Sequence, residues 1–301
     1  MRKNYIVIII LFAVVALVVW MCSGDNSEET NASKGKGSET ALKVGSTPTL
    51  DCLPLFVAYD DSMFFSNGLD IRLVEYQSEI DCDTALVGGS LDMGVSNVVR
   101  AQRLIRKRTP LTFFSSTNRR YSLVTCGGSR IKKLTDLNGK LVGIARFSAS
   151  DFLAERSIDS VKLSRTGVYR VQINDYGIRM RMLINNELEG ALLTEPQATE
   201  AINLNNVRCV DYGDCLGVIV MRADKMQKPQ KKSQLELFKK VYDMAVDSIN
   251  KNGIGHYRNC IMQHCHVKGS TVDSLRTVRF THITPVDCRA IDAAQNWLNK
   301  H

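Results

Sequence analysis

The sequence predicts an α/β protein of two similar lobes, each a mainly parallel sheet flanked by helices. Three observations predict this class. From residue 42 onward, short apolar stretches alternate with amphipathic stretches of helix length, as in strands joined by crossover helices. The segments "ALVGGSLDMGVSN" (85–97) and "MLINNELEGALLTE" (182–195) repeat one pattern. The chain has 301 residues, enough for two domains.

Each copy of the repeat predicts a helix end, a tight turn and a strand. The helix ends at Gly88-Gly89 or at Asn185-Asn186, residues that tolerate the left-handed backbone of a helix C-terminus. A leucine, an acid and a short apolar run follow, and such runs are buried in helix-covered parallel sheets. Ligands bind where these strands end. The polar residues at the two ends are Ser96, Asn97, Thr194 and Glu195.

The remaining elements follow in order. In the first lobe we expect strands at 42–45, 69–76, 93–95 and 111–116. Helices are expected from Pro54, which suits a first turn, from a capping pair at Ser78 and Asp81, and at 98–108. In the second lobe we expect strands at 140–145, 168–175, 191–193 and 216–222. Helices are expected after Ser148, at 176–186 and from Pro196. Lobe 1 is thus predicted at 42–122 and 223–301, and lobe 2 at 123–222.

The N-terminus predicts export. Arg2 and Lys3 precede an apolar run over 5–21, followed by Cys22 and a polar stretch, which is the pattern of a secretory signal. The cysteine at its end is similar to a bacterial lipoprotein signal, so we assign 1–22 as signal or lipoprotein anchor with lipidation at Cys22, and 23–41 as a flexible linker. Met21 departs from the small residue expected before that cysteine, so an uncleaved membrane anchor is the alternative. Both place the rest of the chain outside the cytoplasm, attached to a membrane.

The charge distribution bears on nucleic-acid binding, and the cysteine count bears on disulfide bonds. The net charge is +8, but the basic residues are scattered. The densest run, Arg103–Arg108 with Arg119-Arg120 nearby, lacks interleaved aromatic residues, so we interpret it as a solvated helix face and expect no nucleic-acid partner. Without Cys22 there are eight cysteines, and disulfides are possible in an oxidising compartment. Cys209 and Cys215 flank a turn and are candidates for a bridge.

A second cysteine pair stands in "NCIMQHCH", where Cys260 and Cys265 lie beside His264 and His266. Here we favour packing over a disulfide, and a disulfide over a metal site. The spacing matches no strong zinc pattern, and on one helix the four side chains do not converge. We therefore expect no metal and no cofactor.

Five segments in this order and spacing carry a family resemblance: "LKVGSTPTLDCLPLFVA", "GLDIRLVEYQS", "ALVGGSLDMGVSN", "LTDLNGKLVGIA" and "GALLTEPQATEA". Over residues 42–301 the chain resembles bacterial periplasmic substrate-binding proteins of ABC importers, in the nitrate, sulfonate, taurine and thiamine-precursor (SsuA/THI5-like) group. The resemblance implies the two-lobed type II periplasmic-binding-protein fold, with two strands joining the lobes and a ligand in the cleft. It also implies docking on an ABC permease with its ATPase.

The candidate ligand-binding residues stand at strand ends and helix starts. They are Thr47, Thr49, Asp51, Ser78, Ser96, Asn97, Arg146, Ser148, Ser150, Asn174 and Glu195. Arg146 is suited to a carboxylate, sulfonate or phosphate, whereas Asp51 and Glu195 suit a ligand with hydrogen-bond donors. A small polar or anionic organic solute fits both. The alternative is that Ser78 and Ser148 only cap helices and that Arg146 only pairs with Asp151.

The sequence therefore predicts a membrane-tethered binding receptor of an importer and not an enzyme. One alternative is an enzyme on the same fold, of the menaquinone- or pyrimidine-pathway type. Against it, no nucleophile–base pair stands out, and the five histidines all lie at 256 or later, away from the strand-end loops. The other alternative is a tethered solute sensor without a permease.

Overall fold

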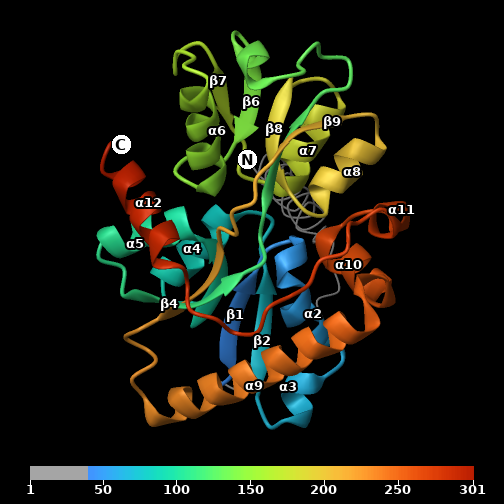
Figure 1. Ribbon diagram of the computed structural model, residues 1–301. Helices are drawn as coiled ribbons and strands as arrows, with labels where there is room; N and C mark the ends of the chain where they lie inside the picture. The colour runs from blue at the N-terminus through green and yellow to red at the C-terminus, as the bar shows by residue number, and fades with distance from the viewer. Residues whose placement is uncertain (1–39) are drawn as a thin grey trace, which may run out of the picture. The chain divides into compact units, whose positions relative to one another are not determined.

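The computed structural model describes residues 40–301. The predicted signal, Cys22 and nearly all of the linker lie outside the described residues. Residues 40–301 form two lobes, each built on a five-stranded sheet (Figure 1). Within this part of the chain no helix combines the length and the apolar character needed to cross a membrane.

The first sheet has the strand order β2-β1-β3-β10-β4. Its strands are β1 (Leu42–Ser46), β2 (Ile71–Glu75), β3 (Met93–Asn97), β4 (Leu111–Thr117) and β10 (Gly217–Arg222). The second sheet has the order β7-β6-β8-β5-β9. Its strands are β5 (Tyr121–Thr125), β6 (Leu141–Ile144), β7 (Tyr169–Gln172), β8 (Gly190–Thr194) and β9 (Val207–Asp211). β1 pairs parallel with β2 and β3, and β6 pairs parallel with β7 and β8. The predicted two-lobed α/β class is confirmed, and both sheets are mixed, because β10 pairs antiparallel with β3 and β4 and β5 pairs antiparallel with β8 and β9.

Helices cover both sheets. In the first lobe they are α2 (Leu53–Asp60), α3 (Met63–Ser66), α4 (Glu79–Val87), α5 (Val98–Arg106), α9 (Pro229–Asn252), α10 (Arg258–Cys265), α11 (Gly269–Asp273) and α12 (Cys288–Leu298). In the second lobe they are α6 (Ala149–Ser160), α7 (Tyr176–Ile184) and α8 (Gln197–Asn203). Short 3₁₀ turns occur at Leu50–Cys52, Leu134–Leu137 and Ile254–Tyr257. The long helix α9 packs beside α2 and α3 (Figure 1), so this part of the chain lies in the first lobe.

The predicted lobe boundary at residue 222 is wrong for one strand. The sequence predicts residues 216–222 in lobe 2, but β10 runs antiparallel between β3 and β4 in the first sheet. The residues from Gly217 to Val220 are buried, and an apolar run of this kind identifies a strand without identifying the sheet that receives it. The chain crosses between the lobes at 118–120 and again at 212–216.

The two copies of the repeat occupy equivalent places. Gly89 has φ +74° and Asn186 has φ +61°, so both helices end in the left-handed conformation that the sequence indicated. Asp92 Oδ2 accepts a hydrogen bond from the N–H of Lys43 in β1 (2.9 Å). Glu189 Oε2 accepts one from the N–H of Leu141 in β6 (2.8 Å). The side chains of Asp92 and Glu189 thus link the start of β3 to β1 and the start of β8 to β6.

Close packing against these strands repeats as well. A Cβ at Gly45 in β1 would lie 2.6 Å from Leu91 Cδ1, and a Cβ at Gly143 in β6 would lie 2.7 Å from Leu188 Cδ1. The two leucines are the equivalent leucines of the repeat, and both are buried. Glycine is required at both positions because a leucine fills the space where a side chain would stand.

The helix α12 contacts both lobes. It packs against α5 of the first lobe (Figure 1). Trp297 lies edge-on to Phe152 of α6, with ring centroids 6.0 Å apart, and its Nε1 donates a hydrogen bond to Glu155 Oε1 (3.1 Å). One apolar cluster consequently continues from the first lobe through α12 into the second.

Candidate functional site

The carboxyl ends of the parallel strands from the two sheets face each other across a closed cleft. Hydrogen bonds between the lobes include Leu50 N to the Glu195 carbonyl (2.8 Å), Ala149 N to Asn97 Oδ1 (3.0 Å) and Gln197 Nε2 to the Pro48 carbonyl (2.5 Å). Each joins a loop that follows a strand of one lobe to the equivalent kind of loop in the other. This is the arrangement in which α/β sheets bind ligands.

One arginine occupies the middle of this cleft. Arg119 lies in the first crossing segment, and its side chain is 1% exposed. Its hydrogen-bond acceptors are Asp51 Oδ1 (3.0 Å), Glu79 Oε1 (2.5 Å), Tyr176 Oη (3.2 Å), Thr47 Oγ1 (3.0 Å) and Thr49 Oγ1 (3.0 Å). A guanidinium has five N–H donors, so the five acceptors satisfy it fully. Tyr176 belongs to the second lobe, and Arg119 therefore connects both lobes.

A second buried arginine lies beside this network. Arg179 of α7 donates to the Leu192 carbonyl (3.1 Å), while its Nε has no hydrogen-bond partner. The hydroxyl of Tyr121, in β5, is likewise buried without a partner. Formally, Arg119 and Arg179 balance the carboxylates of Asp51 and Glu79. The cleft therefore holds both signs of charge and spare hydrogen-bonding capacity, features that suit a polar ligand.

The environment shifts several pKa values. Burial opposes the charge of Arg119, but Asp51 and Glu79 raise its pKa above the usual value. Burial lowers the pKa of Arg179 and raises that of the Tyr176 hydroxyl, which stays protonated and accepts a hydrogen bond from Arg119. Burial also raises the pKa of the Cys52 thiol to about 11. A thiol with such a pKa is neutral at physiological pH and is not an activated nucleophile.

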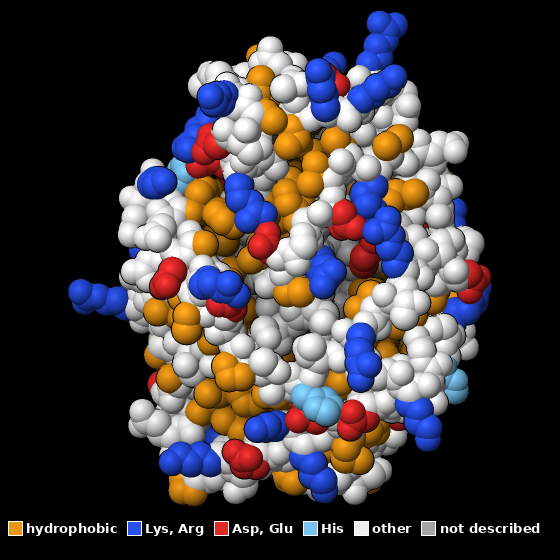
Figure 2. Space-filling model, in the orientation of Figure 1, with side chains coloured by type: hydrophobic (Ala, Val, Ile, Leu, Met, Phe, Trp, Pro, Cys, Tyr) orange, Lys and Arg blue, Asp and Glu red, His pale blue; other side chains and the backbone are white. Residues whose placement is uncertain are grey.

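Two cavities flank the network. One, of about 250 Å³, spans both lobes and the first crossing segment, and its polar lining includes Arg120, Arg279, Thr194 and Glu195. The other, of about 310 Å³, also spans both lobes and is lined by Gln77, Asp175, Arg181 and His266 among others. Figure 2 shows one face hollowed near its middle, where acidic and basic side chains gather.

The structure brings several predicted residues together. Thr47, Thr49 and Asp51 surround Arg119. Asn97 Nδ2 donates to Glu79 Oε2 (2.8 Å), so Asn97 belongs to the same network. Ser96 lies one residue away, with its Oγ 3.4 Å from Asp83 Oδ1.

Glu195 lines the cavity of about 250 Å³. Its carboxylate also accepts hydrogen bonds from Arg208 (2.7 Å) and from the N–H of Thr199 (3.1 Å). The side chain therefore combines a place in the cavity with a structural role at the start of α8.

The remaining predicted residues follow the alternative interpretation. Ser78 caps α4 by accepting from the N–H of Asp81, and Ser148 caps α6 by accepting from the N–H of Ser150. The Ser150 hydroxyl accepts from the N–H of Ala145 (2.9 Å).

Two further candidates stand apart from Arg119. The side chain of Arg146 is 41% exposed and lies 4.0 Å from Asp151. Asn174 contacts Gln172 (3.5 Å) and, through its carbonyl, Arg179 (3.4 Å).

Sequence reasoning missed four central residues: Glu79, Arg119, Tyr176 and Arg179. Interpreting Arg119 as part of a solvated basic surface is wrong, because it is buried in the cleft. Its position was informative, because it stands two residues after the end of β4, at the point where the chain leaves the first sheet. The expectation that all histidines lie away from strand-end loops is also wrong. His266 Nε2 lies 3.2 Å from Nε2 of Gln77, which follows β2.

The eight cysteines of residues 40–301 are all free thiols. The bridge considered between Cys209 and Cys215 is therefore not formed in this structure. In the second pair, Cys265 is buried in the core of the first lobe, as the packing interpretation predicted, and Cys260 is half-buried.

The two lobes, the two crossing segments and the interlobe cleft define the class of two-lobed solute-binding folds, and solved structures agree. The alkanesulfonate-binding protein SsuA from Xanthomonas axonopodis pv. citri, bound to MOPS, superposes with a TM-score of 0.74 at 13% identity, covering 87% of this chain and 92% of that chain. The nitrate-binding protein NrtA from Synechocystis PCC 6803 gives a TM-score of 0.64 at 14% identity, covering 80% and 73%. A Candida albicans gene product with the generic periplasmic binding protein fold gives 0.67 at 15% identity, covering 86% and 89%.

The family is shown by sequence. The family model described as "NMT1/THI5 like" matches residues 49–248, about two thirds of the chain, and the chain belongs to this family. No curated protein matches the sequence significantly. The predicted membership in the SsuA/THI5-like group is confirmed.

Proposed function

We propose that the chain is an extracytoplasmic receptor that binds a small polar or anionic solute between its lobes and delivers it to an ABC importer. One observation carries this proposal: strand-end loops of both lobes converge on a buried polar network with a cavity of about 250 Å³ beside it. The alkanesulfonate-binding and nitrate-binding proteins, which share the fold, are named for anions.

The lining of that cavity supports an anionic group on the solute. Arg120 and Arg279 both line it, and Thr194 adds a hydroxyl. Arginine forms paired hydrogen bonds with sulfonate, carboxylate or phosphate oxygens. Asp51 and Glu195 line the same cavity, so a solute that also carries an amino group fits better than a bare inorganic anion.

Arg119 has a different role from these two arginines. All five of its N–H groups are already satisfied within the protein, which leaves none for a ligand. It pairs with the carboxylates of Asp51 and Glu79 and holds the lobes together on one side of the cavity. Contacts to the solute then fall to Arg120, Arg279 and Thr194.

Binding of this kind works through lobe closure. A solute that touches both lobes favours the closed arrangement by the difference in its affinity for the closed and open forms. The closed form is then the one that docks on the permease. The neutral thiol of Cys52 favours binding over nucleophilic catalysis at this cleft.

Attachment to a membrane belongs to the same proposal. It rests on the basic and apolar N-terminal pattern and on Cys22. We propose a lipid on Cys22 or an uncleaved anchor as the tether, with a permease and ATPase as partners.

The test is a thermal-shift panel on the full chain in detergent, with alkanesulfonates, taurine, nitrate, amino-pyrimidines and aromatic carboxylates. A ligand at a hundredfold excess over Kd stabilises the folded state by about 2.7 kcal/mol, which raises Tm by several degrees. Arg279→Met should weaken binding by about tenfold or more. Arg289→Met is the control, because that side chain is 92% exposed on α12. An active compound that binds both variants equally well would contradict the assigned site.

A further inference from the structure

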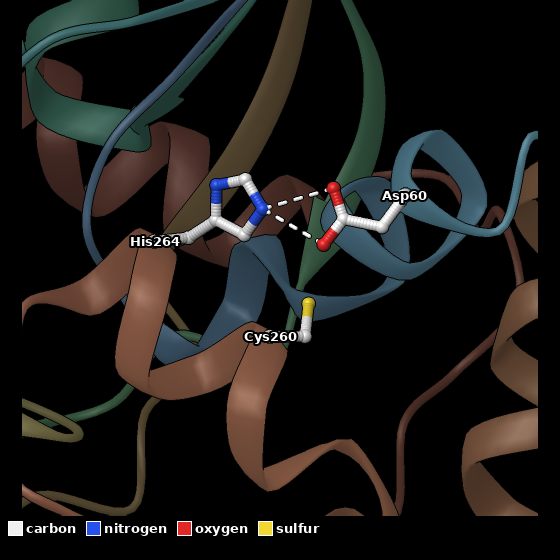
Figure 3. A group of neighbouring side chains, drawn as sticks. All are labelled: Asp60, Cys260 and His264. Carbon is white, nitrogen blue, oxygen red and sulfur yellow. Dashed lines mark hydrogen bonds and ion pairs between the residues drawn. The ribbon is translucent and has the colours of Figure 1, made fainter. Parts of the chain in front are cut away.

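A second cluster of reactive side chains lies in the first lobe, outside the residues that surround Arg119. Cys260 and His264 stand four residues apart on α10 and project from the same face of the helix. Asp60, at the end of α2, approaches from the other side (Figure 3). His264 Nε2 lies 3.0 and 3.1 Å from the two Asp60 oxygens. The ligand atoms of Asp60, Cys260 and His264 all lie within 4.8 Å of one another.

The imidazole of His264 is held in one orientation. Phe56 of α2 stacks on it, with ring centroids 4.2 Å apart and planes 5° from parallel. Glu75, the last residue of β2, places its Oε1 3.1 Å from Nδ1. In metal sites a carboxylate commonly accepts the proton of one imidazole nitrogen and so directs the lone pair of the other at the ion. Glu75 lies beside Nδ1 without a well-aligned hydrogen bond to it, and Nε2 faces the two Asp60 oxygens.

The cluster attracts cations. Burial first, and then the carboxylates of Asp60, Asp61 and Glu75, raise the pKa of the Cys260 thiol, so the charged groups that act on this thiol are all acidic. The side chain of Asp60 is 31% exposed, so an ion and a water molecule can reach it. The other two members of the sequence motif take no part, since Cys265 is buried in the core and His266 lies at Gln77.

We propose that Asp60, Cys260 and His264 bind a zinc ion, with Glu75 as the outer carboxylate on His264 and water as the fourth ligand. Nitrogen, thiolate sulfur and carboxylate oxygen are the donors that zinc takes. Ligand atoms around tetrahedral zinc lie about 3.3–3.8 Å apart, given zinc–ligand bonds of about 2.0–2.3 Å. The exposed Asp60 side chain and the Cys260 rotamer need to close inward by only about 1 Å.

Zinc binding exchanges two protons for the metal. The ion displaces the thiol proton of Cys260 and the proton on Nε2 of His264, which pairs with Asp60 in the metal-free protein, and both protons are released to solvent. The bound ion then links the end of α2 to α10 directly, and to β2 through Glu75. The ion binds the folded first lobe and not the unfolded chain, so it stabilises that lobe. Its binding does not depend on the solute proposed for the cleft.

The first test needs no substitution. The full chain, treated with chelator and reductant, is titrated with Co²⁺, which substitutes for zinc in such sites. One equivalent should produce the thiolate-to-cobalt charge-transfer absorption together with tetrahedral d–d bands, and Zn²⁺ should displace both. Absence of the charge-transfer band would overturn the proposal.

Variants then identify the ligands by calorimetric titration with Zn²⁺. Cys260→Ser should weaken binding at least tenfold, and Glu75→Gln should weaken it about 10- to 100-fold through the orientation of His264. Cys209→Ser is the matched control, because Cys209 is also a half-buried free thiol but lies outside the cluster, and it should bind as the native chain does. Equal affinity in Cys260→Ser and the native chain would place zinc elsewhere and refute the assignment.

Discussion

Replacing Arg119 by methionine should be among the most destabilising single changes in the cleft. The substitution keeps much of the side-chain volume and removes the charge. It leaves the carboxylates of Asp51 and Glu79 buried, with side chains 1% and 6% exposed, and without their cation. Removing one partner of a buried ion pair costs about 3–5 kcal/mol. At about 2–4 °C per kcal/mol for a chain of this size, Tm should fall by roughly 10 °C.

Urea unfolding and calorimetry on the full chain measure this loss. Arg120→Met is the control, since Arg120 is the next residue and is exposed, and it should change stability by less than about 0.5 kcal/mol. Adding Asp51→Asn and Glu79→Gln to Arg119→Met removes the stranded charges. In the native chain Thr117 donates a hydrogen bond to Asp51 and Asn97 donates one to Glu79. The amide oxygens of the new asparagine and glutamine can accept the same two hydrogen bonds. The triple variant should regain more than half of the loss. A loss below about 1 kcal/mol for Arg119→Met, or no recovery in the triple variant, would refute the reasoning.

Two further predictions concern the repeat. Gly45→Ala should cost about 1–3 kcal/mol by overpacking against Leu91, whereas Gly213→Ala, with open space around it, should be nearly neutral in the same urea assay. For Asp92, burial raises the pKa, but hydrogen bonds from Lys231 and from the backbone leave it below the usual value. Its contribution to stability is therefore present at neutral pH and is lost as the pH falls through the carboxyl range. Asp92→Asn should lower the urea midpoint at pH 7 more than at pH 3, and equal losses at both would contradict this.

The sequence was most informative where local chemistry determines local structure. Left-handed residues at Gly89 and Asn186, and buried apolar runs after them, predicted the same helix-to-strand unit in both lobes. Caps at Ser78 and Ser148 followed from side chains that bind nearby backbone groups. These features depend on residues that are close together in the chain, so they can be predicted from a short stretch of sequence.

Long-range placement was less predictable. The apolar sequence of β10 is compatible with a buried strand in either sheet. Its place is set by long-range pairing, because β3 and β4 leave room between them for one antiparallel strand. Arg119 looked like a surface residue because arginine usually is one. Its burial depends on acceptors at Thr47, Asp51 and Glu79, which come from segments 40 to 72 residues away. No local sequence pattern around Arg119 predicts these long-range contacts.

The position of α12 constrains how the lobes separate. In two-lobed proteins the crossing segments alone usually define the axis of motion, but here Trp297 forms a third attachment, to Phe152 and Glu155 of α6. An opening motion must either release that attachment or turn about a line that passes through it. The first route exposes an indole to water, and the resulting change in tryptophan fluorescence gives the molecule a built-in reporter of its own opening. The second route makes the opening a twist about that line instead of a simple hinge motion.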